Sequence, residues 1–281
     1  MNPDIIISGL ILIIAFFIIF FIGKLINDVL HRDYKITYEL VEKDNAALAL
    51  SMVGYYCGLV IALSGILVGE SVSLIDDLLD LAIYGFESIL LLNISWFICD
   101  KIILSKFSVT DELIRDHNQG TGAVLASVCI ASGFVIFGAV QGEGGSIWTV
   151  AVFWLIGQVI LIVAGWVYNA ILPYNLHDEI EKDNVAAGVS FAGALISIGV
   201  IIGLAAEGEF ESWAENLPSF IGYTILGLIL LPLIRLMTDK VLLPTVKLTD
   251  EIANQEKPNV GAAYIEAFAY IASAFIIYWC I

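Results

Sequence analysis

The sequence predicts an all-α integral membrane protein with eight transmembrane helices, arranged as two tandem, parallel four-helix halves. Three observations lead to this fold class. Hydrophobic residues make up 59% of the chain, only 15% are charged and the mean hydropathy is +0.92, whereas soluble domains are about half apolar and a quarter charged. Apolar runs long enough to cross a bilayer recur along the chain. Charged motifs of the first half also recur in the second half.

Eight apolar runs each have about the 20 residues that a spanning helix needs. They lie near residues 5–27, 46–69, 79–99, 120–141, 148–172, 185–206, 217–238 and 260–281. The first run has no basic segment before it and ends in the polar stretch GKLINDVLHR, not at a small-residue cleavage site. We therefore expect it to be retained as a span and not removed as a signal peptide.

The basic residues lie on one side of the predicted membrane. All 12 occur at the end of an odd-numbered run or in the connection to the next even-numbered run: Lys24, Arg32, Lys35, Lys43, Lys101, Lys106, Arg115, Lys182, Arg235, Lys240, Lys247 and Lys257. The opposite connections are acidic, and the net charge of the chain is −17. Because short basic connections stay on the cytoplasmic side, we expect both termini to face outward (N-out/C-out).

The chain repeats itself at one constant offset, which three motifs share. EKDN at 42–45 recurs at 181–184, DK at 100–101 recurs at 239–240, and TDE at 110–112 recurs at 249–251. A single offset for three motifs indicates two four-helix halves, residues 1–140 and 141–281.

A shorter repeat lies inside each half. An acidic segment precedes an asparagine that opens each even-numbered run, namely Asn45, Asn118, Asn184 and Asn259. A Gly-Glu pair closes the first three of these runs, at Gly69-Glu70, Gly142-Glu143 and Gly208-Glu209. The unit is then a helical hairpin present four times. Because a hairpin has an even number of spans, all copies keep one orientation, unlike the inverted repeats of many secondary transporters.

This pattern of an odd-numbered span, an acidic stretch and an Asp-Asn pair before a Gly/Ala-rich span resembles a bacterial family. The family is called domain of unknown function 350, the YjfL-like inner-membrane proteins. The segments EKDNAALA and EKDNVAAG match best, RDHNQGTG is looser, and NQEKPNVGAA carries an insertion. The usual four-span unit of the family corresponds to one half of this chain. The resemblance implies a multi-pass protein of the bacterial inner membrane, and it implies no established activity.

The repeated motif has two interpretations. Its residues are Glu42, Asp44, Asn45, Glu112, Asp116, Asn118, Glu181, Asp183, Asn184, Glu251 and Asn259. In the first, the Asp-Asn pairs cap the free N–H groups at a helix start, so that Asn45→Asp and Asn184→Asp proteins would fold normally. In the second, side chains of the four units converge around an axis and form a polar cytoplasmic ring, an ion vestibule or a docking surface.

The even-numbered runs are rich in glycine, alanine and serine, which let helices approach closely in lipid. The odd-numbered runs carry bulkier residues, as in IIISGLILIIAFFIIFFIG. We therefore expect the even-numbered spans to form an inner layer and the odd-numbered spans to face lipid.

Three polar residues inside the spans form the candidate intramembrane site: Glu87, Asn93 and Glu266. Ionisable groups are costly in hydrocarbon and are usually paired or in contact with water. The offset between the halves places Leu226 opposite Glu87 and Ser127 opposite Glu266. Neither carboxyl is repeated, which favours an asymmetric functional site. The alternative is a protonated carboxyl that bonds to a neighbouring helix.

The sequence contains no nucleophile–base motif, nucleotide-binding loop or metal-ligand spacing, so we expect no enzyme activity, no cofactor and no metal. One hypothesis is a channel or transporter for cations or small solutes, because the acidic outer connections would concentrate cations. The other is a scaffold that docks a cytoplasmic protein on its acidic motif segments. The expected partner is the lipid bilayer. A cytoplasmic protein partner and a homo-oligomer stay open, and nothing indicates nucleic acid.

Overall fold

The structure, a computed structural model, describes residues 3–69, 71–142 and 144–280, and all regular elements in these ranges are helical. Eight of these helices are long and apolar enough to span a membrane, which confirms the predicted number. They are α1 (Pro3–Leu30), α3 (Ala46–Val68), α4 (Leu74–Ile98), α6 (Gln119–Gln141), α7 (Ile147–Ile171), α9 (Val185–Ala206), α10 (Trp213–Met237) and α12 (Val260–Cys280).

Two of the spans continue into π-helical turns at equivalent places in the two halves. α4 leads into η1 (Cys99–Ile103) and α10 into η2 (Thr238–Leu242), so that the recurring DK dipeptide lies in both turns. Of the predicted Gly-Glu pairs, Glu70 and Glu143 lie outside the described residues, while Glu209 is exposed beyond the end of α9.

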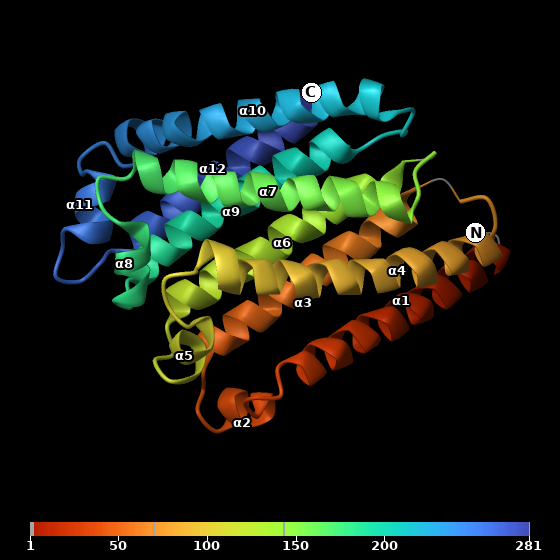
Figure 1. Cartoon of the computed structure of the whole chain (residues 1–281), viewed down its shortest axis with the longest axis horizontal. Coiled ribbons are helices and arrows are strands. Elements are labelled where there is room, and N and C mark those ends of the chain that lie inside the picture. The colour runs from red at the N-terminus through yellow and green to blue at the C-terminus, as the bar shows by residue number, and fades with distance from the viewer. Residues whose placement is uncertain (1–2, 70, 143, 281) are drawn as a thin grey trace.

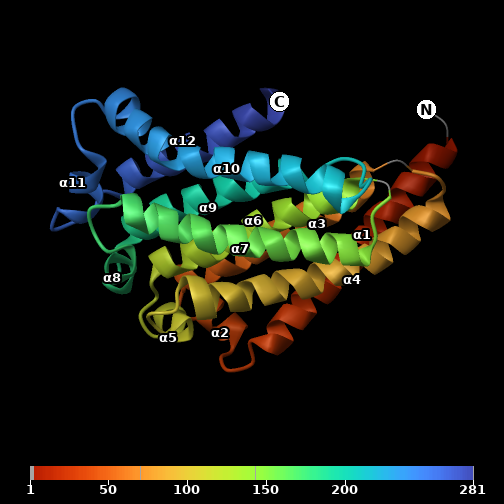
Figure 2. The same cartoon turned by 45° about the horizontal axis from the view of Figure 1, so that its top comes forward.

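The spans form two layers (Figures 1 and 2). In the inner layer α3, α6, α9 and α12 pack on one another in that order, and the outer layer contains α1, α4, α7 and α10. The helices α4, α7 and α10 each pack most extensively on the inner helix that precedes them, which is α3, α6 and α9, respectively. The helices α6 and α9 are the most buried spans and α1 is the least, which confirms that the small-residue spans are innermost.

Glycine lets the inner helices touch backbone to backbone. A Cβ added to Gly54 of α3 would lie 2.1 Å from the Cα of Ala126 of α6, and one added to Gly138 of α6 would lie 2.0 Å from the carbonyl oxygen of Gly203 of α9. Larger residues would force these helices apart. The contact leaves no room for a pore between neighbouring inner helices.

The inner helices form an open row with two edges. α3 lies at one edge and α12 at the other, and no extensive packing joins them in the described part of the chain. The interpretation in which four units converge around an axis into a ring is therefore wrong. The reason is that each inner helix uses opposite faces for its two neighbours, so successive units are displaced along a row.

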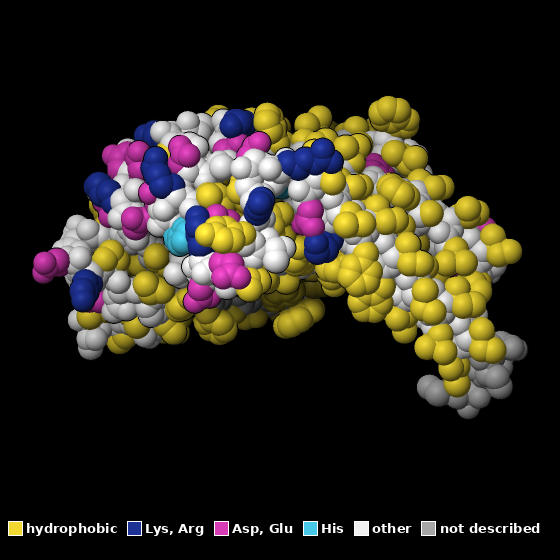
Figure 3. Space-filling view, turned by 90° about the horizontal axis from the view of Figure 1, so that it is seen from below, with side chains coloured by type: hydrophobic (Ala, Val, Ile, Leu, Met, Phe, Trp, Pro, Cys, Tyr) yellow, Lys and Arg dark blue, Asp and Glu magenta, His cyan; other side chains and the backbone are white. Residues whose placement is uncertain are grey.

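Four short helices that the sequence analysis does not predict lie at one end of the bundle. They are α2 (Ile36–Val41), α5 (Val109–Ile114), α8 (Leu176–Glu181) and α11 (Leu248–Ala253), and each connects an outer helix to the next inner helix. Apolar residues four positions apart, such as Leu176 and Ile180, are buried and share one helix face. Charged side chains gather at this short-helix end, as Figure 3 shows. One outer, one short and one inner helix form a unit.

Candidate functional site

An asparagine caps each inner helix, as the first interpretation of the motif predicts. The Oδ1 atoms of Asn45, Asn118, Asn184 and Asn259 each accept a hydrogen bond from the backbone N–H three residues later, at 3.0 to 3.1 Å. The bond satisfies one of the N–H groups that a helix start leaves free.

Each asparagine also binds a glutamate on the short helix before it. The glutamates are Glu39, Glu112, Glu179 and Glu251. The asparagine Nδ2 donates to the carboxylate at 2.7 to 3.4 Å, and the asparagine backbone N–H donates to the backbone carbonyl of the same glutamate at 2.7 to 3.1 Å. The pair thus fixes the turn between the short and the inner helix.

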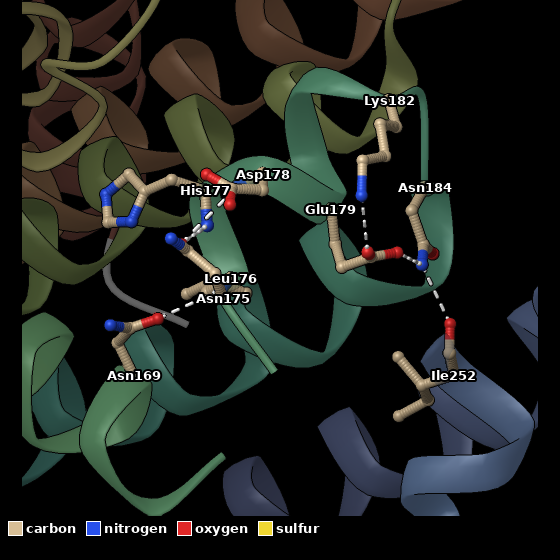
Figure 4. A network of polar contacts seen from close by, with 9 residues as sticks. All are labelled: Asn169, Asn175, Leu176, His177, Asp178, Glu179, Lys182, Asn184 and Ile252. Carbon is tan, nitrogen blue, oxygen red and sulfur yellow. Dashed lines mark hydrogen bonds and ion pairs between the residues drawn. The ribbon is translucent and has the colours of Figure 1, made fainter. Parts of the chain in front are cut away.

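The first three asparagines donate a second bond to the short helix of the next unit. The acceptors are the backbone carbonyls of Leu113 for Asn45 (2.7 Å), Ile180 for Asn118 (2.6 Å) and Ile252 for Asn184 (2.8 Å). We call the asparagine, its glutamate and this carbonyl a joint; Figure 4 shows the third one, with Lys182 on Glu179. Each joint ties two successive units together.

The residue before the first three asparagines has a left-handed backbone. The φ angles are 50° at Asp44, 55° at His117 and 61° at Asp183, and Asp and His are among the non-glycine residues that adopt this region most often. In the fourth unit Pro258 stands at this position, and its ring fixes φ near about −65°. The turn there is accordingly longer: eight positions separate Asn259 from Glu251, against six for Asn45 and Glu39.

Two glutamates of the repeated motif lie outside the joints. Glu42 and Glu181 are exposed, whereas Glu39 and Glu179 bind Asn45 and Asn184. That Asn45→Asp folds normally stays a prediction, and it has to overcome a second carboxylate placed close to Glu39. The signal that identifies the glutamates of the joints is a recurring tripeptide, YEL, DEL, DEI and DEI at 38–40, 111–113, 178–180 and 250–252. The last residue of the second, third and fourth tripeptides supplies the carbonyl that accepts from the preceding asparagine.

The carboxylates of the first two joints have opposite electrostatic environments. Burial raises the pKa of Glu39, but hydrogen bonds from Lys43 and Asn45 outweigh burial and hold the pKa below its ordinary value. Burial also raises the pKa of Glu112, and the hydrogen bond from Asn118 does not offset it, so this pKa lies above its ordinary value. The joint therefore forms whether the pKa of its glutamate is lowered or raised.

One ion pair is buried among the spans of the second half. Arg235 of α10 donates through Nη1 to Oε1 of Glu266 of α12. Glu266 is completely buried, and the Arg235 side chain is 11% exposed. Pro232 lies three positions before Arg235, and the π turn η2 begins three positions after it. The arginine thus sits in an irregular part of α10.

Five polar atoms of this pair and its neighbours are buried and make no hydrogen bond of normal geometry in the described chain. They are Oε2 of Glu266, Nη2 of Arg235, and the hydroxyls of Tyr168, Tyr174 and Ser190. Ser190 faces the carboxylate of Glu266. Both tyrosines lie close enough to interact electrostatically with Glu266 and Arg235. Buried polar atoms without partners are costly. We call these five residues the ion-pair cluster, since a small polar or charged species there would supply the missing bonds.

Asn93 belongs to a separate, neutral network in the first half. Its Oδ1 accepts from Asn27 at 3.3 Å, and its Nδ2 donates to the Tyr55 hydroxyl at 2.9 Å. The offset between the halves places Trp96 opposite Arg235. In the fourth unit the turn before Asn259 is two positions longer than the turn before Asn118, so that, counted from the capping asparagines, Leu125 and not Ser127 is opposite Glu266. The first half therefore has no counterpart of the ion pair.

Glu87 stands apart from both networks. It is half-buried on α4, and neither carboxylate oxygen has a hydrogen-bond partner among the described residues. No hydrogen bond in the described ranges connects Glu87, Asn93 and Glu266. The three residues predicted as one intramembrane site are thus found in three different surroundings.

The repeat of the joints agrees with comparisons against known proteins. The family described as Domain of Unknown Function (DUF350) matches residues 1–140 and again residues 144–281. The chain belongs to the DUF350 family. It is 28% identical over 270 residues to the "UPF0719 transmembrane protein" of Aquifex aeolicus (strain VF5), which covers 94% of this chain and 96% of that protein. No solved structure matches the chain. The resemblance seen in the sequence is confirmed, and this DUF350 protein is a multi-pass membrane protein.

Glu266 of this DUF350 protein is recognisable in the sequence, but its partners are not. Arg235 resembles the basic residues at span ends, although it lies inside the apolar stretch LLPLIRLM, and that position could have marked it. Tyr168, Tyr174 and Ser190 carry no comparable signal. Their place beside Glu266 depends on how α7, the connection from α7 to α8, and α9 pack around α12.

Proposed function

We propose that this DUF350 protein is a transporter that moves a small cation, in the simplest case a proton, across the bacterial inner membrane. The observation that carries the proposal is the ion-pair cluster, in which one oxygen of a buried carboxylate is bound to Arg235 and the other has no partner among the described residues. Charged groups inside a membrane are costly and are commonly part of an ion or proton pathway. Glu266 is accordingly the group that accepts the cation.

In this mechanism Arg235 and the transported cation exchange at Glu266. When Arg235 binds the carboxylate, the charge of Glu266 is balanced without a cation, and when Arg235 withdraws, a cation must replace it. The irregular part of α10 favours such a movement, because Pro232 removes a backbone hydrogen bond and π turns often occur at functional sites. Access would then alternate, since the closely packed inner row disfavours a fixed pore.

The orientation of the cluster is part of the proposal. The basic residues predict that the short-helix end, and with it the end of α10 that carries Arg235, faces the cytoplasm. Thiol labelling tests this orientation: Ser146→Cys should react with an impermeant reagent from outside, and Lys182→Cys only from the cytoplasm. Reaction of both from one side would contradict the predicted orientation.

Flux measurements in proteoliposomes test the function. We expect the purified protein to dissipate a proton, Na⁺ or K⁺ gradient, and Glu266→Gln to lower the rate at least about tenfold by removing the charge that holds the cation. Glu87→Gln is the matched control, because Glu87 is also a carboxyl on a span but lies outside the cluster. An unchanged rate in Glu266→Gln would remove this residue from the mechanism.

A membrane scaffold for a cytoplasmic protein is the second candidate function. The absence of space between the described inner helices favours it, and the exposed Glu42 and Glu181 remain available to a partner. Wild-type protein that conducts none of the three cations would favour the scaffold over the transporter.

A further inference from the structure

The first outer helix lacks the support that the other outer helices have. The helices α4, α7 and α10 lie on the inner helix of the preceding unit, and 50%, 44% and 28% of the residues in their most apolar stretches are buried. No unit precedes α1 in the described chain, and only 6% of its most apolar stretch is buried. Its exposed face is a row of large residues that includes Ile14, Ile18 and Phe21.

The opposite edge of the molecule has an apolar groove that a further outer helix could occupy. An apolar groove of about 230 Å³ lies between α10 with η2 and α12, and Ile234, Val241, Phe268 and Ala272 are among its lining residues. One unit earlier, the groove between α7 and α9 is occupied by α10. The groove at α12 is therefore where a further outer helix would lie if the row continued.

The first edge also carries a groove. It has a volume of about 430 Å³ and lies between α1 and the end of α3, with Leu12, Ile66 and Leu67 in its lining. A preceding inner helix would lie on this side, just as α3 lies between α4 and α6.

The two edges of the row also carry complementary hydrogen-bonding groups. Asn259 keeps its cap and its glutamate but makes no bond to a next unit in the described residues, and it is exposed, whereas the other three asparagines are at most 3% exposed. At the first edge, the carbonyl of Leu40 corresponds to those of Leu113, Ile180 and Ile252, yet no described side chain donates to it. One edge thus has a spare donor and the other a spare acceptor.

We propose that copies of this chain associate head to tail in the membrane, with α1 of one copy in the α10–α12 groove of the next and Asn259 bonded to the neighbouring copy's Leu40 carbonyl. The interface would continue the one that occurs three times within the chain. It is heterologous, so it closes into a ring or extends as a filament according to the rotation between copies.

The contact between copies is wider than the contacts inside one chain. α6 presents Ala126 and Gly133 to α3, and when Asn45 is aligned with Asn118, Val53 and Val60 take these places on the free face of α3. β-Branched residues keep helix backbones further apart than glycine does. The copies are therefore separable, whereas the units of one chain are not.

Cross-linking between two singly substituted proteins tests the arrangement. In a background with the exposed Cys57 and Cys280 replaced by serine, Ile18→Cys protein is mixed with Ala272→Cys protein in liposomes and treated with a short bifunctional thiol reagent. Val159→Cys on α7 replaces Ile18→Cys as the control, because both positions are equally far from the short-helix end of their helices and both side chains are just over half exposed. Ala272 lies at the same depth on α12.

We expect a dimer from Ile18→Cys with Ala272→Cys at least about tenfold above the Val159→Cys control, and little dimer from either protein alone. Ser273 also lines the α10–α12 groove. Adding Ser273→Trp, which fills the groove, should remove the cross-link without lowering the melting temperature of the monomer. Equal cross-linking in the control would reflect random collision, and self-cross-linking of Ile18→Cys would indicate a two-fold interface. Either result, or no cross-link at all because lipid fills the groove, overturns the proposal.

Discussion

The internal repeat is preserved at the short-helix end of the molecule but not in the interior of the spans. At the short-helix end, an equivalent asparagine binds an equivalent glutamate in each of the four units. Inside the spans, the first half has the neutral network of Asn93 and the second half has the ion pair of Arg235 and Glu266. The joints therefore recur along the whole row, whereas the ion pair belongs to the second half alone.

The largest effect should come from breaking the unrepeated pair. Glu266→Ala leaves a buried arginine without its counter-charge and should lower the free energy of unfolding by about 4 kcal/mol. The double variant Arg235→Met/Glu266→Leu, which makes the second half apolar like Trp96 and Leu125, should recover most of this loss and still lack transport. Thermal unfolding in detergent measures both. A double variant as unstable as Glu266→Ala would mean that the pair is part of the scaffold.

The repeated asparagines should show a graded effect along the row. Asn184→Ala removes three side-chain hydrogen bonds and should cost about 3 kcal/mol at about 1 kcal/mol each. Asn259→Ala removes two bonds at an exposed position and should cost about 1 kcal/mol in the detergent-solubilised monomer. Chemical denaturation compares the two variants. Equal losses would show that the bond from Asn184 to the Ile252 carbonyl contributes nothing to stability.

A smaller effect should distinguish the first two joints by pH. The pKa of Glu39 is lowered in the folded state, so its contribution is present above the unfolded pKa of about 4.3 and is lost as the pH falls. The pKa of Glu112 is raised, so its contribution is present at low pH and is lost as the pH rises.

Relative to wild type, Glu39→Gln should therefore be less stable at pH 7 than at pH 4, and Glu112→Gln should be more stable at pH 7 than at pH 4, each by less than about 1 kcal/mol. Melting temperatures at the two pH values test the signs. The same sign in both variants would contradict the environments described for the two carboxylates.

The smallest effect is expected at Glu87. Glutamine has the size of glutamate and would replace a side chain that has no hydrogen-bond partner among the described residues. Glu87→Gln should therefore change the free energy of unfolding by less than about 0.5 kcal/mol. A clear loss of stability in the melting curve would show that Glu87 has a partner and would weaken the separation of repeated from unrepeated residues.

The spans and their layers were predictable from the sequence, because hydropathy and small residues determine both. The short helices were not, since an element of less than two turns shows too little periodicity to be recognised. The contacts of the asparagines were not predictable from the repeated EKDN, because they depend on a helical turn that brings Glu39 and Glu179, and not Glu42 and Glu181, to the asparagine.

The open row could have been inferred from the glycines if the helix face on which each glycine contacts its neighbour had been known. On α6, Gly122 and Gly133 approach α3, whereas Gly138 approaches α9. Opposite faces of one helix require a neighbour on each side. The ion-pair cluster was only partly predictable, because its side chains come from four different helices and a connecting segment, and they meet only in the folded chain.

The joint makes the architecture extensible. Because each joint is completed by the unit that follows it, stability is a sum over nearest neighbours, as in solenoid proteins. Adding or deleting a whole hairpin would change the number of joints and leave both edges of the row chemically the same. A gene duplication of such a protein therefore adds units that can form the same joint. The constant offset between the two halves is then explained by a duplication of one half, whose product could fold without further changes.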